Sequence, residues 1–332
     1  MKFKELVSIK EVESVSLAER IVFKAKTGGL HYLTKDGGFS KIIESVYDYK
    51  AVKDEIYFQE ENLKKLSRFK ANCEAIEILD GEFSLRGAFL INENVIYVLG
   101  KNHGKKSIWI IDRKSLKVRD VVEYTTFPFL NVDEKKEIFK RNNYILCTNL
   151  LTEEVFWSYQ LPENEKLIGE MYFHKGVLVF ATMEGEVNED KIFLYGVDVN
   201  TGKLLYKREG AFHYYQKQPE TGFLFGFGHG FYEVTNPITG EKIVEKKLTD
   251  ELWVSQHMNF LGPDGLYFIG GNHTNMGMFI SKFGKINIET HQIDFVQNLD
   301  VKEGVKADAP IYYEGKLYIK DSENVLHIYE NT

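Results

Sequence analysis

A strand–turn–strand pattern recurs along the chain of 332 residues and constrains its fold more than any other feature. The clearest copy, "YGVDVNTGKLLYKREG" at 195–210, has an apolar run, a turn rich in Asn, Thr and Gly, and a second run of alternating residues. Two such runs around a polar turn predict a β-hairpin. Further copies begin near residues 33, 66, 110, 146, 233 and 285, so the mean spacing is about 42 residues.

A second hairpin precedes most copies of this pattern. Examples are "AFLINENVIYVLG" at 88–100, "MYFHKGVLVFATM" at 171–183 and "MNFLGPDGLYFIGG" at 258–271, each with Gly, Asn or another turn residue between two apolar runs. Two hairpins within about 40–45 residues form a four-stranded unit, which is typical of a propeller blade. The sequence therefore predicts an all-β fold, a β-propeller of four-stranded antiparallel blades. One short run, "EKKEIFK" at 134–140, has helix-like spacing.

The two ends of the chain predict how the propeller closes. Residues 311–330 contain three strands of a blade without a fourth, and "KFKELVSIKE" at 2–11 can supply that strand. Closure of the ring in this way removes exposed sheet edges. Seven hairpins and this composite blade favour eight blades, or seven if the degenerate first copy is not a full blade. We expect a single domain spanning 1–332, because no Pro-rich or Ser/Gly-rich linker interrupts the chain.

The segment "GVDVNTGKLLYK" resembles the repeat of the quinoprotein-type (PQQ-like) β-propellers, Asp-x-x-Thr-Gly-Lys-x-Leu-Trp, and "NPITGEKIVEK" and "NLLTEEVFWSY" resemble it more loosely. The resemblance implies that Asp198 opens the outer hairpin turn and that Thr201 and Gly202 shape it. It also implies that an aromatic residue, Tyr206 here and Trp157 in its own copy, packs between blades.

The family's quinone-dependent enzymes differ from this chain in their chemistry. Those enzymes bind the quinone with a vicinal cysteine pair and metal ligands, whereas the two cysteines here, Cys73 and Cys147, are not adjacent. The resemblance therefore implies the fold, without a cofactor, in a non-enzymatic cytoplasmic member of the family. By themselves, both cysteines fall in predicted strands and are expected to be buried.

Charge and hydropathy limit the classes of partner. The net charge is -7, which argues against nucleic acid, because binding a phosphate backbone needs a basic face. No run approaches the roughly 18 apolar residues of a membrane helix. The first twenty residues carry charges throughout and lack the apolar core of a signal peptide. We therefore expect a cytoplasmic protein that binds neither nucleic acid nor membrane.

The candidate binding site is a histidine-rich face at the mouth of the predicted channel. In a propeller, strand 1 of each blade lines the channel, and the loop between strands 2 and 3 opens on the same face. Two adjacent blades place histidines at both positions, His213 and His229 in the sixth blade and His257 and His273 in the seventh. The aromatic and amide residues beside them are Tyr214, Trp253, Asn272 and Asn275.

Three functions are compatible with this face. Aromatic and imidazole side chains on a rim can form a protein contact surface. The acidic chain favours a basic partner through electrostatic steering. Our first hypothesis is therefore a non-catalytic, protein-binding scaffold, and its concrete version is an immunity protein that caps a basic toxin or enzyme.

The two alternatives use the same residues differently. Converging neutral imidazoles can bind a transition metal, which would suit a metal-dependent hydrolase or lyase acting on a sugar or lactone. No short-spaced metal motif identifies the ligands, and no catalytic residue is assigned, although Glu170, Glu184 and Glu186 fall near this face in the same register. The third hypothesis is a cytoplasmic sensor that stacks a small ligand on Trp253 and Tyr214.

Overall fold

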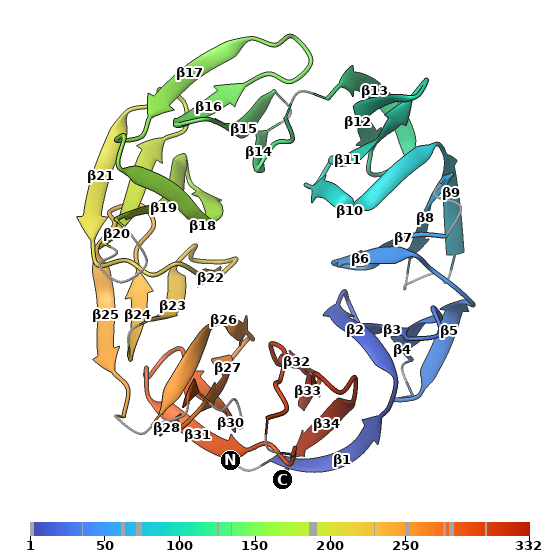
Figure 1. Cartoon of the computed structure of the whole chain (residues 1–332), viewed down its shortest axis with the longest axis vertical. Helices are drawn as coiled ribbons and strands as arrows, with labels where there is room; N and C mark the ends of the chain where they lie inside the picture. Colours follow the sequence, from blue (N-terminus) through green and yellow to red (C-terminus); the bar gives the residue numbers. More distant parts are fainter. Residues whose placement is uncertain are drawn as a thin grey trace. The chain divides into compact units, whose positions relative to one another are not determined.

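The computed structural model contains eight four-stranded antiparallel sheets, which confirms the predicted eight-bladed β-propeller (Figure 1). The residues that it describes are 3–34, 36–60, 64–70, 75–124, 126–133, 135–185, 191–228, 230–249, 252–274, 277–278, 282–302 and 304–332, and the side chains of 86–88, 273, 274, 277 and 278 are not among the described groups. No helix occurs in these ranges, so none of them holds a helix long and apolar enough to cross a membrane.

The chain divides into two compact units, unit 1 with Met1–Lys10 and Pro162–Thr332, and unit 2 with Glu11–Leu161. The single domain spanning 1–332 stays a prediction.

Unit 2 contains the first four blades. Blade 1 is β2 (Val12–Leu17), β3 (Ile21–Ala25), β4 (Leu30–Leu33) and β5 (Phe39–Ile43). Blade 2 is β6 (Asp48–Val52), β7 (Glu55–Gln59), β8 (Lys65–Lys70) and β9 (Ala75–Asp80). Blade 3 is β10 (Glu82–Ile91), β11 (Val95–Asn102), β12 (Lys105–Asp112) and β13 (Lys117–Glu123). Blade 4 is β14 (Leu130–Asp133), β15 (Lys136–Arg141), β16 (Tyr144–Thr148) and β17 (Val155–Gln160).

Unit 1 contains the other four blades. Blade 5 is β18 (Glu165–His174), β19 (Val177–Glu184), β20 (Lys191–Asp198) and β21 (Leu204–Glu209). Blade 6 is β22 (Tyr215–Lys217), β23 (Leu224–Gly228), β24 (Phe231–Thr235) and β25 (Lys242–Lys247). Blade 7 is β26 (Trp253–Leu261), β27 (Gly265–Gly271), β30 (Lys282–Asn287) and β31 (Ile293–Asn298), with the hairpin β28 (His273–Thr274) and β29 (Gly277–Met278) inserted. Blade 8 is β32 (Ile311–Tyr313), β33 (Lys316–Lys320), β34 (Leu326–Asn331) and β1 (Phe3–Ile9).

The helix-like spacing at 134–140 gave a wrong expectation, because Lys136–Arg141 forms strand β15. Its centre pairs with β16, and Ile138 lies opposite Cys147. Both of these side chains are fully buried. Burial within the sheet therefore outweighs the weak helical preference of so short a run.

The turn in the clearest repeat forms as the family resemblance implied. The Asp198 Oδ1 atom accepts hydrogen bonds from the backbone N–H of Asn200 (3.0 Å) and Thr201 (2.8 Å), and from the Thr201 hydroxyl (2.8 Å). Gly202 follows with a φ of 71°, a conformation that costs glycine little. The equivalent turn in blade 7 uses Asn287, whose side-chain oxygen accepts from the second and third residues after it.

Tyr206 packs between blades 5 and 6. Its hydroxyl donates to the Pro237 carbonyl oxygen at 2.7 Å. A β-carbon built on Gly196 of blade 5 would lie 2.1 Å from this aromatic ring, and one on Gly240 of blade 6 would lie 2.4 Å from it. Both glycines are therefore required for the ring to sit there, which confirms the position that the resemblance implied for Tyr206.

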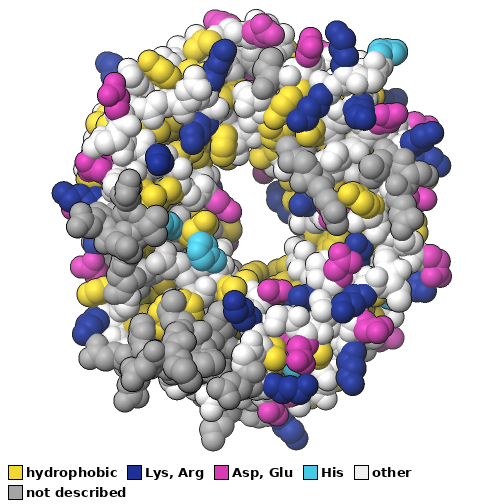
Figure 2. All heavy atoms as spheres, viewed as in Figure 1, with side chains coloured by type: hydrophobic (Ala, Val, Ile, Leu, Met, Phe, Trp, Pro, Cys, Tyr) yellow, Lys and Arg dark blue, Asp and Glu magenta, His cyan; other side chains and the backbone are white. Residues whose placement is uncertain are grey.

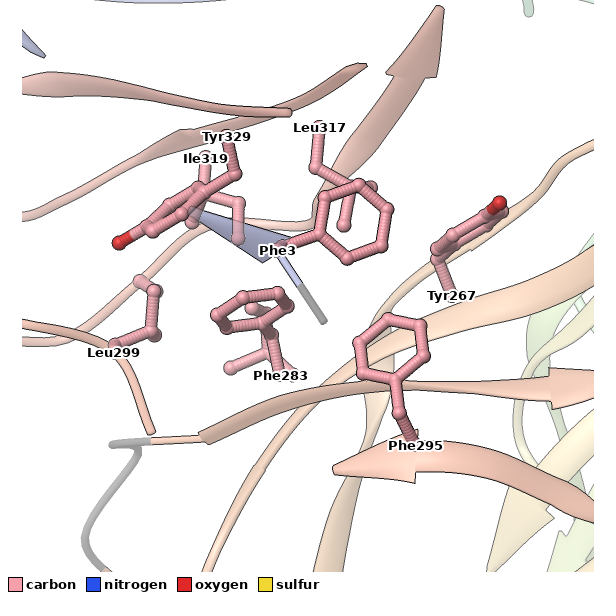
Figure 3. Close-up of a cluster of buried hydrophobic side chains, with 10 residues drawn as sticks. Phe3, Tyr267, Phe283, Phe295, Leu299, Leu317, Ile319 and Tyr329 are labelled. Carbon is pink, nitrogen blue, oxygen red and sulfur yellow. The ribbon is translucent and has the colours of Figure 1, made fainter. Parts of the chain in front are cut away.

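The N-terminal strand completes blade 8, as predicted, by pairing with β34. Phe3 anchors it: its backbone N–H donates to the Gln297 side-chain oxygen at 3.0 Å, and its carbonyl oxygen accepts from Gln297 Nε2 at 2.5 Å. The Phe3 side chain enters a buried aromatic cluster of blades 7 and 8 together with Phe283, Phe295 and Tyr329 (Figure 3). The first strand of the chain is thus held by contacts with residues about 300 positions away.

A buried histidine also joins β1 to blade 8. His327 Nδ1 lies 2.8 Å from Glu5 Oε1, and its Nε2 lies 3.0 Å from Asp321 Oδ2. Both ring nitrogens can donate only when the imidazole is charged. Burial by itself lowers the pKa of His327, but the hydrogen bonds to Asp321 and Glu5 raise it more, so the pKa lies above its usual value.

We expect this contact to make the stability of the chain pH-dependent. A histidine whose pKa is raised by folding stabilises the folded chain. This stabilisation is complete below the pKa of the unfolded chain, about 6.5, and it is lost as the pH rises through the pKa of the folded chain. The difference in unfolding midpoint between the wild type and His327→Gln should therefore be largest near pH 6 and shrink toward alkaline pH, measured by urea titration at each pH. The exposed His103→Gln variant is the control. A difference independent of pH would contradict the charged contact.

Candidate functional site

The structure describes five of the eight predicted site residues in full. His213 and Tyr214 lie in the loop immediately before β22, as predicted. His257 lies within β26 rather than before it, since that strand already begins at Trp253. Asn272 follows β27. The backbone of His273 lies in β28, but its side chain is outside the described groups, as are His229 and Asn275 altogether.

Three of the predicted residues come together at the first strands of blades 6 and 7, β22 and β26. The rings of Tyr214 and His257 are perpendicular neighbours, with centroids 3.8 Å apart and planes at 64°. The rings of His213 and Tyr214 are stacked at 6.3 Å. His257 is exposed, and the other two side chains are half-buried. We call His213, Tyr214 and His257 the inner-strand cluster, because β22 and β26 lie on the inner side of this unit (Figure 1).

An irregularity in β26 presents His257. The pairing of β26 with β27 shifts between Val254 and Asn259, so the residues between them leave the regular ladder. Within this bulge, the backbone N–H of Met258 donates to Ser255 Oγ at 3.3 Å. Asn259 Nδ2 donates to the Gln256 carbonyl oxygen at 2.8 Å. Bulges of this kind re-aim side chains, and here the exposed side chain is an imidazole.

A second irregularity, in β18, supports the other side of the cluster. Its pairing with β19 shifts between Ile168 and Tyr172. Gly169 lies in this bulge with a φ of 64°, and a β-carbon built on it would be 2.1 Å from the His213 carbonyl oxygen. Only glycine permits this close approach of the two backbones. Blade 5 therefore holds the loop that carries the cluster.

Hydrogen bonds from β18 fix the segment that follows the cluster. The Tyr172 hydroxyl donates to the Tyr215 carbonyl oxygen at 2.7 Å and accepts from the Tyr215 N–H at 3.2 Å. Lys217 Nζ donates to the Phe173 carbonyl oxygen at 2.8 Å. Burial, with the nearby charge of Glu170, raises the pKa of Tyr172 well above its usual value, so its hydroxyl stays protonated. Strand β22, which follows the cluster, is thus held by three hydrogen bonds to β18.

Trp253 and Asn272 belong to a different part of the blade. Trp253 pairs with Gly271 at the start of β26, and Asn272 comes next after that pair. Trp253 therefore lies four residues before His257 on β26, which the sequence register did not show.

Sequence reasoning missed the residues that support the cluster, Gly169 and Tyr172. The one available signal was the glycine inside "KLIGEMYFH", since a glycine within a strand often marks a bulge.

Sequence reasoning also missed a cavity of about 720 Å³ in unit 2, which lies between β13 and blade 4 and is lined by residues such as Val122, Phe139 and Leu146. None of the predicted site residues lines that cavity.

The described residues contain no group of three or more His, Cys, Asp or Glu side chains that could hold a metal ion. Cys147 is buried in β16, as expected, and burial raises its pKa to about 11, so its thiol is protonated at neutral pH. Cys73 lies outside the described residues.

The inner-strand cluster itself offers aromatic faces and imidazole nitrogens on a fixed backbone, groups that suit contact with a partner's side chains.

The blades and their turns define a β-propeller. No family model matches the chain, and the comparison with curated proteins found no match. Among solved structures, the chain is similar to BamB from Moraxella catarrhalis, with 14% identity, a TM-score of 0.55, and 100% of this chain and 98% of that chain covered. This likeness supports the β-propeller fold.

Two further structures show the same likeness. The Dos1 propeller has 11% identity and a TM-score of 0.57, with 99% of this chain and 95% of that chain covered. The dihydro-heme d1 dehydrogenase NirN, solved in complex with DHE, has 10% identity and a TM-score of 0.53, with 86% of this chain and 66% of that chain covered. At these identities the likeness shows the fold alone.

Proposed function

We propose that this chain is a non-catalytic, protein-binding propeller that uses the inner-strand cluster as its contact surface. The observation that carries the proposal is the Tyr214–His257 pair, partly exposed, with ring centroids 3.8 Å apart, where Tyr214 lies in the loop before β22 and His257 lies in β26. Rigid aromatic side chains lose little conformational entropy on binding, which is why they are frequent at interface hot spots. The braced backbone limits this cost further.

Charge indicates the kind of partner. The net charge of -7 attracts a basic protein over a distance of about a Debye length. On the face drawn in Figure 2, Lys/Arg and Asp/Glu side chains lie interspersed. Electrostatics would therefore speed the encounter, and the cluster would provide local contacts. The specific form of the proposal is an immunity-type antagonist that caps a basic toxin or enzyme in the cytoplasm, without binding nucleic acid or membrane.

The test is recovery of a stoichiometric partner on the tagged chain from lysate of its own host. We expect one basic protein, recovered at low salt and reduced at high salt. The double variant Tyr214→Ala/His257→Ala should recover at least about tenfold less, because a central hot spot contributes about 2 kcal/mol or more. Quantitative mass spectrometry of the eluates measures this loss.

A matched control is Tyr144→Ala/His103→Ala, which removes an exposed tyrosine and an exposed histidine from unit 2. Equal recovery by both double variants would contradict the proposed surface. A preparation that contains no protein partner but stoichiometric metal would instead favour the metal-dependent hydrolase or lyase. Saturable binding of a small ligand without turnover would favour the sensor.

A further inference from the structure

Glu170 is an exposed carboxylate beside the inner-strand cluster. Within the described part of the chain, no ion pair that includes it is recorded. Other acidic residues of these blades differ in this respect: Glu165 lies 2.5 Å from Lys207 Nζ, and Glu233 lies 2.6 Å from Arg208. A carboxylate on a strand that has no recorded ion pair is available to a charge from outside.

The bulge in β18 places Glu170 near Tyr214. The backbones of Gly169 and His213 are in contact. Glu170 directly follows Gly169, and Tyr214 directly follows His213. Burial raises the pKa of the Tyr172 hydroxyl, and Glu170 and Tyr214 both add to that rise, which agrees with their placement beside this bulge. The site therefore combines a negative charge with an aromatic ring and an exposed imidazole.

We infer that Glu170 and Tyr214 receive a lysine or arginine side chain of the partner protein. A cation over a tyrosine ring is attracted by the negative face of the ring, and a charge-assisted hydrogen bond to a carboxylate adds to that attraction. Arginine fits better than lysine, because its planar guanidinium can stack on the ring and bond to the carboxylate at the same time. The inference rests on the proposed function and names the group that the surface recognises.

The probe is N-acetyl-arginine methylamide, and its neutral analogue is N-acetyl-citrulline methylamide, which has nearly the same shape without the charge. The full chain is labelled with fluorotyrosine, and the Tyr214 signal is assigned by its loss in Tyr214→Phe. We expect the arginine probe to shift this ¹⁹F signal with a millimolar dissociation constant. The citrulline probe should bind at least about tenfold more weakly, which corresponds to about 1.4 kcal/mol.

The decisive variant is Glu170→Gln, which keeps the size of the side chain and removes its charge. It should weaken the arginine probe at least about tenfold. Glu209→Gln removes the same charge from an exposed position on the outer strand β21 and should leave binding within about twofold, since a screened distant charge contributes little. Equal weakening by the two variants would mean that only net charge matters and would overturn the inference.

The same variants separate this inference from the proposed function. If the protein partner is lost with Tyr214→Ala/His257→Ala but is retained by Glu170→Gln, and the arginine probe does not shift Tyr214, then the cation site is wrong and the contact surface stands. If the arginine probe binds as expected but no protein partner is recovered, the cation site stands and the proposed scaffold function fails.

Discussion

Replacing Phe283 with alanine should lower the free energy of unfolding by about 3–5 kcal/mol, the range for deleting a large buried aromatic side chain. Phe283 is 1% exposed. Its ring centroid lies 4.9 Å from that of Tyr329, 6.0 Å from that of Phe295 and 6.3 Å from that of Phe3. These neighbours come from three other strands (Figure 3), so the cavity cannot collapse without moving all of them.

Urea unfolding measures this loss, and hydrogen exchange shows where it acts. Because Phe3 packs on Phe283, the amides of β1 should exchange faster in Phe283→Ala than in the wild type. Phe283→Leu, which leaves a smaller cavity, should cost less, and Phe156→Ala, at a residue 38% exposed, should change the midpoint little. A loss below about 1 kcal/mol in Phe283→Ala would show that this cluster does not hold the last blade together.

The second large effect concerns a buried charge network in unit 2. Glu55 is 6% exposed and accepts hydrogen bonds from Arg113 Nε at 2.6 Å and Arg68 Nη1 at 3.1 Å. The Tyr57 hydroxyl also donates to it at 2.8 Å. Arg68 is fully buried, so Glu55→Ala removes a negative partner from a guanidinium that water cannot reach. We expect a loss of about 3–5 kcal/mol, as for other broken buried ion pairs.

Two variants make this prediction specific. Glu55→Gln keeps an acceptor for the hydrogen bonds and should lose less stability than Glu55→Ala. Glu93→Ala removes an exposed glutamate of the same unit, paired with Lys53 only at 3.9 Å, and should leave the urea midpoint nearly unchanged. If Glu55→Ala and Glu93→Ala have similar midpoints, the buried network does not stabilise the blade.

Buried pairs of a tyrosine and a carboxylate recur in both units. The hydroxyl of Tyr97 donates to Glu137 at 2.8 Å, and that of Tyr195 donates to Glu165 at 2.6 Å. Two further buried pairs among the described residues are Tyr57 with Glu55 and Tyr215 with Glu233. The repeat thus carries polar contacts as well as hairpins. They satisfy carboxylates that would otherwise be costly to bury.

These pairs were not predictable, because their partners are not at a fixed distance along the chain. Tyr57 and Glu55 are two residues apart, whereas Tyr97 and Glu137 are forty apart. A charged residue such as Glu233 within "FYEVT" breaks the apolar pattern, yet the pattern alone does not say whether it faces water or a neighbouring blade. The approach of two blades decides that question.

The candidate site was predicted in the same partial way. The equivalence of positions in successive blades located His213 and Tyr214 before β22. The same equivalence placed His257 before its strand, because it assumed that β26 is short and regular. In the structure β26 begins at Trp253, before His257, and carries a bulge. It did not indicate that Gly169 brings blade 5 against His213, because the two residues are 44 positions apart and no local pattern connects them.

The sequence by itself determined the four-stranded blades and their turns, including the N-terminal strand that completes the last blade, and it favoured eight blades over seven. Those features depend on local chemistry: alternation with period two selects strands, and Asp198 or Asn287 followed by polar residues selects the turn. Only the tertiary structure decided which charges are buried, where strands bulge, and that Tyr214 meets His257 beside Glu170. These depend on the close approach of neighbouring blades, where a difference of one ångström separates contact from clash.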